Sequence, residues 1–129
     1  SVGQALIAII LVIVYISFMR LKAEIWIGAL LRRAQSAGAM ALVAHRGDKD
    51  AGTVMVRVNR LDGCSALFVP FTGLDGDRRW RVLADLNTCD SKVEEIISRE
   101  IQYDPDLWVV EIEDRQGRHF LDEVIDILE

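Results

Sequence analysis

The sequence contains few of the residues from which metal and redox centres are commonly built. It has 2 cysteines and 2 histidines in 129 residues, and Cys64 and Cys89 form no CxxC pair. A structural zinc site needs four ligands at short paired spacings, so His45 and His119 do not complete one. We interpret both cysteines as reduced, partly buried residues, with a single disulfide as the alternative.

Motifs for cofactor binding and nucleophilic chemistry are missing as well. The sequence has no GxGxxG, GxxxxGK[ST] or GxSxG segment, and no short motif joins a cysteine to a histidine. Glu111 and Glu113 would share one side of a strand and could hold magnesium, but alternation explains them more simply as a solvated face or as partners of Arg79 and Arg81. We therefore predict no catalytic residue, no cofactor and no metal; a non-enzymatic role is favoured, with enzymatic activity left open.

Charge is absent from the first eighteen residues. All 35 charged residues lie at or after Arg20, and residues 5–16 are an unbroken apolar run. Extended to Met19, the run makes about 22 Å of helix, whereas a bilayer core of about 30 Å needs roughly twenty residues. We divide the chain into an apolar prefix, residues 1–18, interpreted as an upstream remnant, and a single domain, residues 19–129. The alternative is a native inner-membrane anchor that leaves the domain on the cytoplasmic side.

The net charge of −5 is unevenly distributed along the rest of the chain. Residues 19–89 carry 11 basic and 7 acidic side chains, a balance of +4, whereas residues 90–129 carry 4 and 13, a balance of −9. A solvated acidic tail is the simpler interpretation. A polarised surface that steers a partner is the alternative.

Hydrophobic periodicity after Met19 predicts an α+β fold. Period-two alternation predicts strands at 20–27, 40–46, 53–61, 64–71, 78–83 and 107–113, with 118–121 as a further candidate. Helical spacing predicts helices at 28–38, 91–104 and 121–129, the first ended by Gly38 and the second opened by a capping box from Ser91 to Glu94. The result is one mainly antiparallel sheet of five to seven strands with two or three helices.

Polar side chains opposite the apolar positions of the expected strands form a candidate contact face: Lys22, Trp26, Arg57, Asn59, Arg79 and Arg81. An aromatic residue among basic ones on a sheet resembles the way RNA-binding sheets stack bases and hold phosphates. The negative net charge and the single outward aromatic residue weaken that interpretation. We predict a small cytoplasmic protein-interaction or regulatory module with an unknown protein partner. An RNA-associated accessory protein is the alternative, and a homodimer through opposite charges is a further hypothesis.

Three segments resemble one family of short bacterial proteins: MRLKAEIWIGALLRRAQSAGA, AHRGDKDAGTVMVRVNRLDG and DPDLWVVEIEDRQGRHFLDEV. The family is known mainly from alphaproteobacteria and is catalogued only as a domain of unknown function, number fourteen ninety-one of that series. The resemblance covers about residues 19–124. It implies that the domain begins near Met19, where members typically start, and the apolar prefix is not part of the family pattern. It implies no established activity and supplies no catalytic residues.

Overall fold

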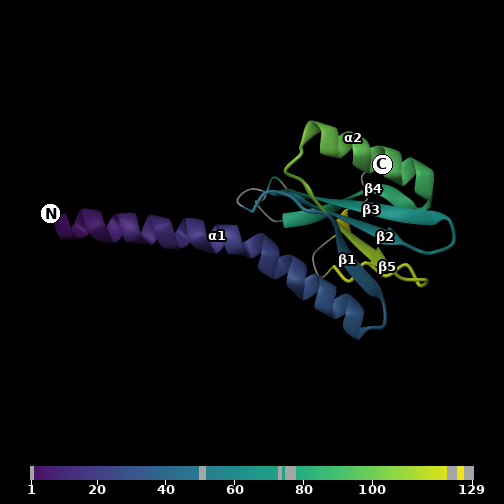
Figure 1. Cartoon of the computed structure of the whole chain (residues 1–129), viewed down its shortest axis with the longest axis horizontal. Coiled ribbons are helices and arrows are strands. Elements are labelled where there is room, and N and C mark those ends of the chain that lie inside the picture. Colours follow the sequence, from purple (N-terminus) through teal and green to yellow (C-terminus); the bar gives the residue numbers. More distant parts are fainter. Residues whose placement is uncertain (1, 50–51, 73, 75–77, 122–124, 127–129) are drawn as a thin grey trace.

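In the computed structural model, the described part of the chain forms a six-stranded mixed sheet and two helices (Figure 1). The structure describes residues 2–49, 52–72, 74, 78–121 and 125–126; the side chains of residues 15–22, 72, 78, 125 and 126 are outside this description. The elements in chain order are α1 (Val2–Ser36), β1 (Met40–His45), β2 (Val54–Asn59), β3 (Cys64–Thr72), β4 (Arg78–Cys89), α2 (Asp90–Tyr103), β5 (Trp108–Glu113) and β6 (Ile125–Asp126).

The strands are arranged in the order β1-β5-β2-β3-β4-β6. The pairs β1–β5, β2–β3 and β3–β4 are antiparallel, whereas β2–β5 and β4–β6 are parallel. After β4, the chain runs through α2 along one face of the sheet and inserts β5 between β1 and β2 (Figure 1). The predicted α+β class, with a mainly antiparallel sheet, is confirmed.

One face of the sheet packs against the C-terminal half of α1. Val54, Val56 and Val58 alternate along β2 and are at most 3% exposed, as period-two geometry requires of a buried face. Ile27 and Leu30, one helical turn apart in α1, belong to the same buried cluster. Burial of this apolar surface fixes α1 against the sheet.

The other face packs against α2, and this burial was not predicted. Met55, Leu67 and Val109 lie at positions opposite the first core, yet each is at most 2% exposed. They form a second cluster with Val93 of α2, against which Ile96, Ile97 and Ile101 are packed. The sheet is therefore covered on both faces, and the face expected to be solvated is largely interior.

The strand predicted at residues 20–27 is wrong, because this segment belongs to α1. Its residues alternate in polarity, but Ile27, Leu30 and Ala34 also follow helical spacing, and it is these three that are buried. The helix ends as predicted near Gly38, whose φ of 91° is a left-handed conformation. The amide of Ala39 donates to the carbonyl of Ala34 at 3.0 Å, which closes the last turn.

The expectations for the other helices are corrected in part. α2 begins at Asp90, and its N-cap residue, Cys89, makes no side-chain capping bond, so the predicted Ser91–Glu94 capping box does not form. The helix ends at Tyr103, before Pro105, as the restriction on residues preceding proline requires. Residues 118–121 form no strand. Of the helix expected at 121–129, residues 125–126 form β6 instead, and 122–124 and 127–129 lie outside the described residues.

The apolar prefix forms the N-terminal part of α1, which continues through Met19 without interruption. Figure 1 shows this part of the helix extending away from the sheet. The side chains of residues 2–14 are exposed. Among the helices of the described residues, none has both the length and the apolar character needed to cross a bilayer.

A clamp of polar contacts ties the segment after β5 to the end of α1. Asp114, 7% exposed, accepts hydrogen bonds from Arg118 Nε at 2.8 Å and Nη2 at 3.1 Å. The side-chain hydrogen bonds from Arg118 lower the pKa of Asp114, and they raise the pKa of the guanidinium in return. Arg118 also donates to the carbonyl of Ala37, and Arg33 donates to the carbonyl of Phe120. Arg118 and Arg33 thus connect the segment after β5 to the C-terminal end of α1.

We expect Ile27→Ala to lower the free energy of unfolding by about 2–5 kcal/mol, because it leaves a cavity beneath α1. Ile25→Ala is the matched control, since Ile25 is 62% exposed and Ile27 is 4% exposed; its effect should stay within about 0.5 kcal/mol. Urea denaturation of both variants measures the difference. In a strand, Ile25 and Ile27 would share one face, so equal losses would contradict the helical assignment.

We expect stability to fall as the pH decreases below about 6.5, the ordinary value for histidine, in part because of His119. Burial lowers the pKa of His119, and its Nδ1 accepts a hydrogen bond from the amide of Leu121 at 2.9 Å, which requires a neutral ring. The unfolded chain binds this proton first, so the contribution is complete above the unfolded pKa and is lost as the pH falls towards the folded pKa. His119→Asn keeps an acceptor and should flatten the melting temperature between pH 7 and 5; an unchanged slope would contradict the assignment.

Candidate functional site

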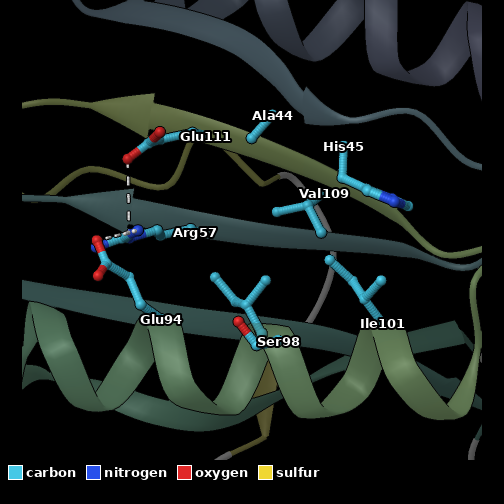
Figure 2. A pocket seen from close by; sticks show the side chains of 9 residues that line it. Ala44, His45, Arg57, Glu94, Ser98, Ile101, Val109 and Glu111 are labelled. Atoms are coloured by element: carbon cyan, nitrogen blue, oxygen red, sulfur yellow. Dashed lines mark ion pairs between the residues drawn. The ribbon is translucent and has the colours of Figure 1, made fainter.

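A partly open pocket of about 380 Å³ lies between α2 and the α2-facing side of the sheet (Figure 2). Figure 2 shows Val109 at its centre, with Arg57, Glu94 and Glu111 at one end and His45 at the other. The remaining lining residues are Ala44, Ile97, Ser98 and Ile101. The pocket therefore combines an apolar middle with polar ends, as ligand and peptide sites usually do.

The periodicities of three elements bring these residues together. Arg57 follows the buried Val56 on β2, so strand alternation turns its side chain to the α2 side. Glu111 is its direct neighbour on the parallel strand β5. Glu94, Ile97 and Ser98 are three and four residues apart, so they share the face of α2 that looks onto the sheet.

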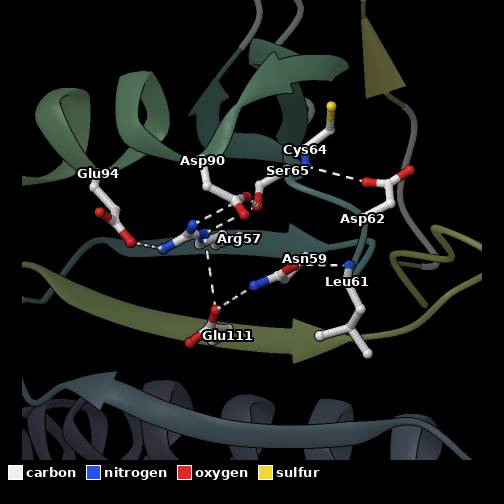
Figure 3. Close-up of polar contacts among 9 residues, drawn as sticks. All are labelled: Arg57, Asn59, Leu61, Asp62, Cys64, Ser65, Asp90, Glu94 and Glu111. Carbon is white, nitrogen blue, oxygen red and sulfur yellow. Dashed lines mark hydrogen bonds and ion pairs between the residues drawn. The ribbon is translucent and has the colours of Figure 1, made fainter.

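The guanidinium of Arg57 is held by three carboxylates (Figure 3). It lies 3.4 Å from Asp90, 3.7 Å from Glu94 and 3.8 Å from Glu111, and only 10% of the arginine side chain is exposed. Arg57 Nε also donates to Ser65 Oγ at 3.3 Å, and the Ser65 hydroxyl donates to Asp90. A buried charge must be paired in this way, because an unpaired one is costly to remove from water.

The charged end of the pocket is acidic in balance. One guanidinium faces three carboxylates, so the cluster of Arg57, Asp90, Glu94 and Glu111 carries two excess negative charges. Asn59 donates to Glu111 at 3.4 Å without changing that charge. Within the described residues, no group of His, Cys, Asp or Glu side chains could hold a metal ion. The arrangement suits a cationic group more than a phosphate.

The opposite end of the pocket is fixed by a loop folded over Trp108. His45 Nδ1 and the carbonyl of Leu107 are 2.7 Å apart, and Trp108 Nε1 donates to the carbonyl of Asp48 at 2.9 Å. A Cβ at Gly47 would collide with the backbone of Asp106, so only glycine permits this close approach. The end of β1 is therefore held against β5 beside the pocket.

β1 borders the pocket and presents apolar side chains to solvent. Met40 is 65% exposed, Leu42 is 40% exposed and Val43 is 38% exposed. β1 pairs with β5 on one side, and on its other side no strand of the described residues is bonded to it. A side-chain bond does reach its backbone, from Gln35 Nε2 to the carbonyl of Ala41 at 3.3 Å. β1 is thus an accessible edge strand.

The structure divides the six residues of the predicted contact face between the α2 side of the sheet and helix α1. Arg57 and Asn59 are on the α2 side of the sheet, within the acidic network. Arg79 and Arg81 occupy the same side of β4, because Arg81 is paired with Val69 of the α2-side cluster. Arg81 lies 5.1 Å from the ring centroid of Phe71, to which it is bound as a cation–π pair.

The two remaining residues of that face belong to α1. Trp26 packs on the opposite side of the sheet, stacked on Trp80 with ring centroids 5.4 Å apart. Lys22 lies in the helix, and its side chain is outside the described part. The predicted placement of Trp26 on the same sheet face as the arginines is therefore wrong. A contact role for the four sheet residues stays a prediction.

Comparison with known proteins identifies the family. The model of the family described as a protein of unknown function, DUF1491, matches residues 21–122. The chain belongs to the DUF1491 family. A DUF1491 protein from Caulobacter crescentus, known from a crystal structure, has 46% sequence identity to this chain. The match covers 79% of this chain and 95% of the Caulobacter chain, and the two structures superpose with a TM-score of 0.73. A comparison with curated proteins found no match.

Two solution structures agree with this assignment. A DUF1491 protein from Caulobacter crescentus is 45% identical over 80% of this chain and 94% of its own, with a TM-score of 0.70. A protein from A. tumefaciens is 32% identical over 84% of this chain and 98% of its own, with a TM-score of 0.69. The DUF1491 region contains the whole pocket and β1, and it excludes the exposed apolar residues 2–14.

Some residues of the DUF1491 pocket were not found from the sequence. Glu94 appeared to belong to a capping box, Asp90 was not singled out, and His45 carried no motif. The signal for a covered second face was present in Met55 and Val109, which are apolar at positions expected to be polar. The contacts of Arg57 with α2, β3 and β5 depend on the order of the strands in the sheet. The alternation of polar and apolar residues within one strand does not give that order.

We expect Arg57→Met to lower the free energy of unfolding by about 1–3 kcal/mol, because it leaves three carboxylates close together without their cation. Glu94→Gln should change it by less than about 1 kcal/mol, since the Glu94 side chain is 66% exposed. Denaturant titration of both variants at neutral pH provides the measurement. An Arg57→Met protein as stable as the wild type would contradict the central position of Arg57.

Proposed function

We propose that this DUF1491 protein is a non-enzymatic, cytoplasmic interaction module that binds an extended segment of a partner protein along β1. The observation that carries the proposal is the exposed apolar edge of β1, which has no strand neighbour on its outer side among the described residues. The cytoplasmic location rests on the low cysteine content of the sequence.

Strand addition would supply both affinity, through backbone hydrogen bonds, and specificity, through side-chain contacts. An extended peptide pairs its backbone with the outer N–H and C=O groups of an edge strand, and alternate side chains enter neighbouring pockets. Natural sheets usually protect a long edge with lysine, proline or a bulge pointing away. The strand MALVAH contains no lysine or proline, and its three most apolar exposed residues are Met40, Leu42 and Val43. Its pairing with β5 is irregular only between Val43 and His45, so the regular part of the edge includes all three.

The charge of the neighbouring pocket specifies the partner segment further. Leu42 pairs with Glu111 across β1 and β5, so both face the α2 side. A strand added outside β1 would lie about 10 Å from β5, two strand spacings away. The long side chain of a lysine or arginine in that strand could extend over β1 towards Glu111 and Glu94. We infer a partner segment that combines apolar residues with at least one basic residue.

The RNA-associated alternative has less support. Arg57 is neutralised by carboxylates, and Trp26 stacks on Trp80 instead of standing among the arginines. Arg79 and Arg81 on β4 are what such a role would depend on. Phosphate contacts would give an affinity that falls steeply with added salt, whereas an interface with an apolar centre would give a shallow dependence.

We expect Leu42→Lys to abolish capture of the partner from nuclease-treated native lysate, because a lysine on the edge opposes strand addition and repels a basic segment. Leu83→Lys on β4 is the matched control, with 39% exposure against 40% for Leu42, and should retain the partner. Quantitative mass spectrometry with isotope labelling identifies the proteins that Leu83→Lys captures and Leu42→Lys does not. Equal capture by both variants, or a partner that is recovered only from lysate without nuclease, would contradict the proposal.

The same captured partner tests the charge preference. Glu94→Gln should weaken its binding severalfold, whereas Glu95→Gln, the neighbouring residue outside the pocket, should not, although the two side chains are 66% and 60% exposed. Titration calorimetry at two salt concentrations measures the effect.

Light scattering of the isolated chain tests whether a second copy of this chain occupies β1. Self-pairing would double the mass, and Leu42→Lys would restore the mass of a monomer.

A further inference from the structure

We propose that Cys64 and Cys89 form a thiol pair that a peroxide converts into a disulfide between β3 and β4. The two cysteines are direct partners in the antiparallel ladder of these strands. Both are free thiols, Cys89 exposed and Cys64 half-buried. The inference is independent of the function proposed for β1.

The hydrogen bonds around the pair identify its geometry. The amide of Asp90 donates to the carbonyl of Gly63 at 2.9 Å, which joins the residue after Cys89 to the residue before Cys64. The carbonyl of Cys64 accepts from the amide of Arg60 at 3.1 Å, and so points towards β2 and away from β4. Both bonds are those of a non-hydrogen-bonded pair, in which the two side chains stand on the same face of the sheet.

This type of pair meets the distance requirement of a disulfide. Facing residues at a non-hydrogen-bonded position have Cα atoms about 4.5 Å apart. Disulfide-linked cysteines have Cα atoms about 4.4–6.8 Å apart. The bond therefore forms by side-chain rotation, without separation of the strands.

The chemistry requires one peroxide and no other reactant. The thiolate of the more exposed Cys89 attacks one peroxide oxygen, the O–O bond breaks, and the departing hydroxide takes up a proton to become water. Cys64, as its thiolate, then attacks the sulfur of the resulting sulfenic acid, and the S–O bond breaks to release a second water. The two sulfurs lose two electrons in all, and these reduce the peroxide.

The disulfide would lie next to the polar contacts between Arg57, Ser65 and Asp90. Cys64 precedes Ser65 and Cys89 precedes Asp90, and the hydroxyl of Ser65 donates to the carboxylate of Asp90. Asp90 in turn lies 3.4 Å from Arg57 (Figure 3). A covalent bond between the strand ends restrains the first turn of α2, where the acidic end of the pocket begins.

Hydrogen peroxide on the full chain tests the proposal. We expect the intact mass to fall by two hydrogen atoms, both thiols to become resistant to alkylation, and peptide mapping to recover the Cys64–Cys89 link. The melting temperature should rise by about 5–15 °C and return to its original value with a thiol reductant. Hydrogen exchange should slow at the amides around Asp90.

Two single variants control for these changes. Cys64→Ser and Cys89→Ser remove one thiol each and should show neither the mass loss nor the thermal shift. The mass result on the wild-type chain decides the question even if a variant fails to fold. Oxidation that adds oxygen to either cysteine without loss of two hydrogens, or that yields only disulfide-linked dimers, would overturn the proposal.

Discussion

The buried guanidinium of Arg57 links the elements on the α2 side of the sheet. A charge that is 10% exposed requires carboxylates close by, and these come from α2 and from β5. Asp90 satisfies this requirement at the first residue of α2, and Ser65 connects the two groups from β3. The start of the helix, the insertion of β5 beside β2 and the position of β3 are thereby coupled through one side chain. An acidic residue in the first turn of α2 also interacts favourably with the helix dipole.

The ion pairs of Arg57 make the surface around it negative, whereas the arginine alone suggests a positive surface. Alone on an open sheet, an arginine would attract phosphate; surrounded by Asp90, Glu94 and Glu111, it contributes to a surface with excess negative charge. The neighbouring apolar wall of Val109 and Ile101 completes a pocket suited to a basic side chain with an aliphatic stem. The function inferred from a residue depends here on what the fold places around it.

Local patterns in the sequence predict those features that local physics decides. The alternation of Val54, Val56 and Val58, the end of α1 just before Gly38 and the end of α2 before Pro105 each depend on residues a few positions apart, and each was predicted correctly. The segment 20–27 satisfies two periods at once, and only burial of Ile27 beneath the sheet selects the helix.

The candidate site could be predicted only in part, because its partners are distant along the chain. Arg57 and Asn59 were recognised as polar residues opposite a core, and that is their position. Their contacts with Glu111 require β5 to lie beside β2, and the facing of Cys64 and Cys89 requires the register of β3 on β4. Strand order and register are set by packing over the whole domain and not by any short segment.

The insertion of β5 also explains why β1 is exposed. β1 and β2 are consecutive strands, but β5 occupies the space between them, so β1 is displaced to the margin and keeps β5 as its strand neighbour within the described sheet. An edge carrying Met40, Leu42 and Val43 without a lysine or proline tends to associate with other strands. Helix α1 covers the face behind β1 and leaves these three side chains at least 38% exposed. An edge of this kind favours the addition of a further strand, which is the physical reason for proposing a partner there.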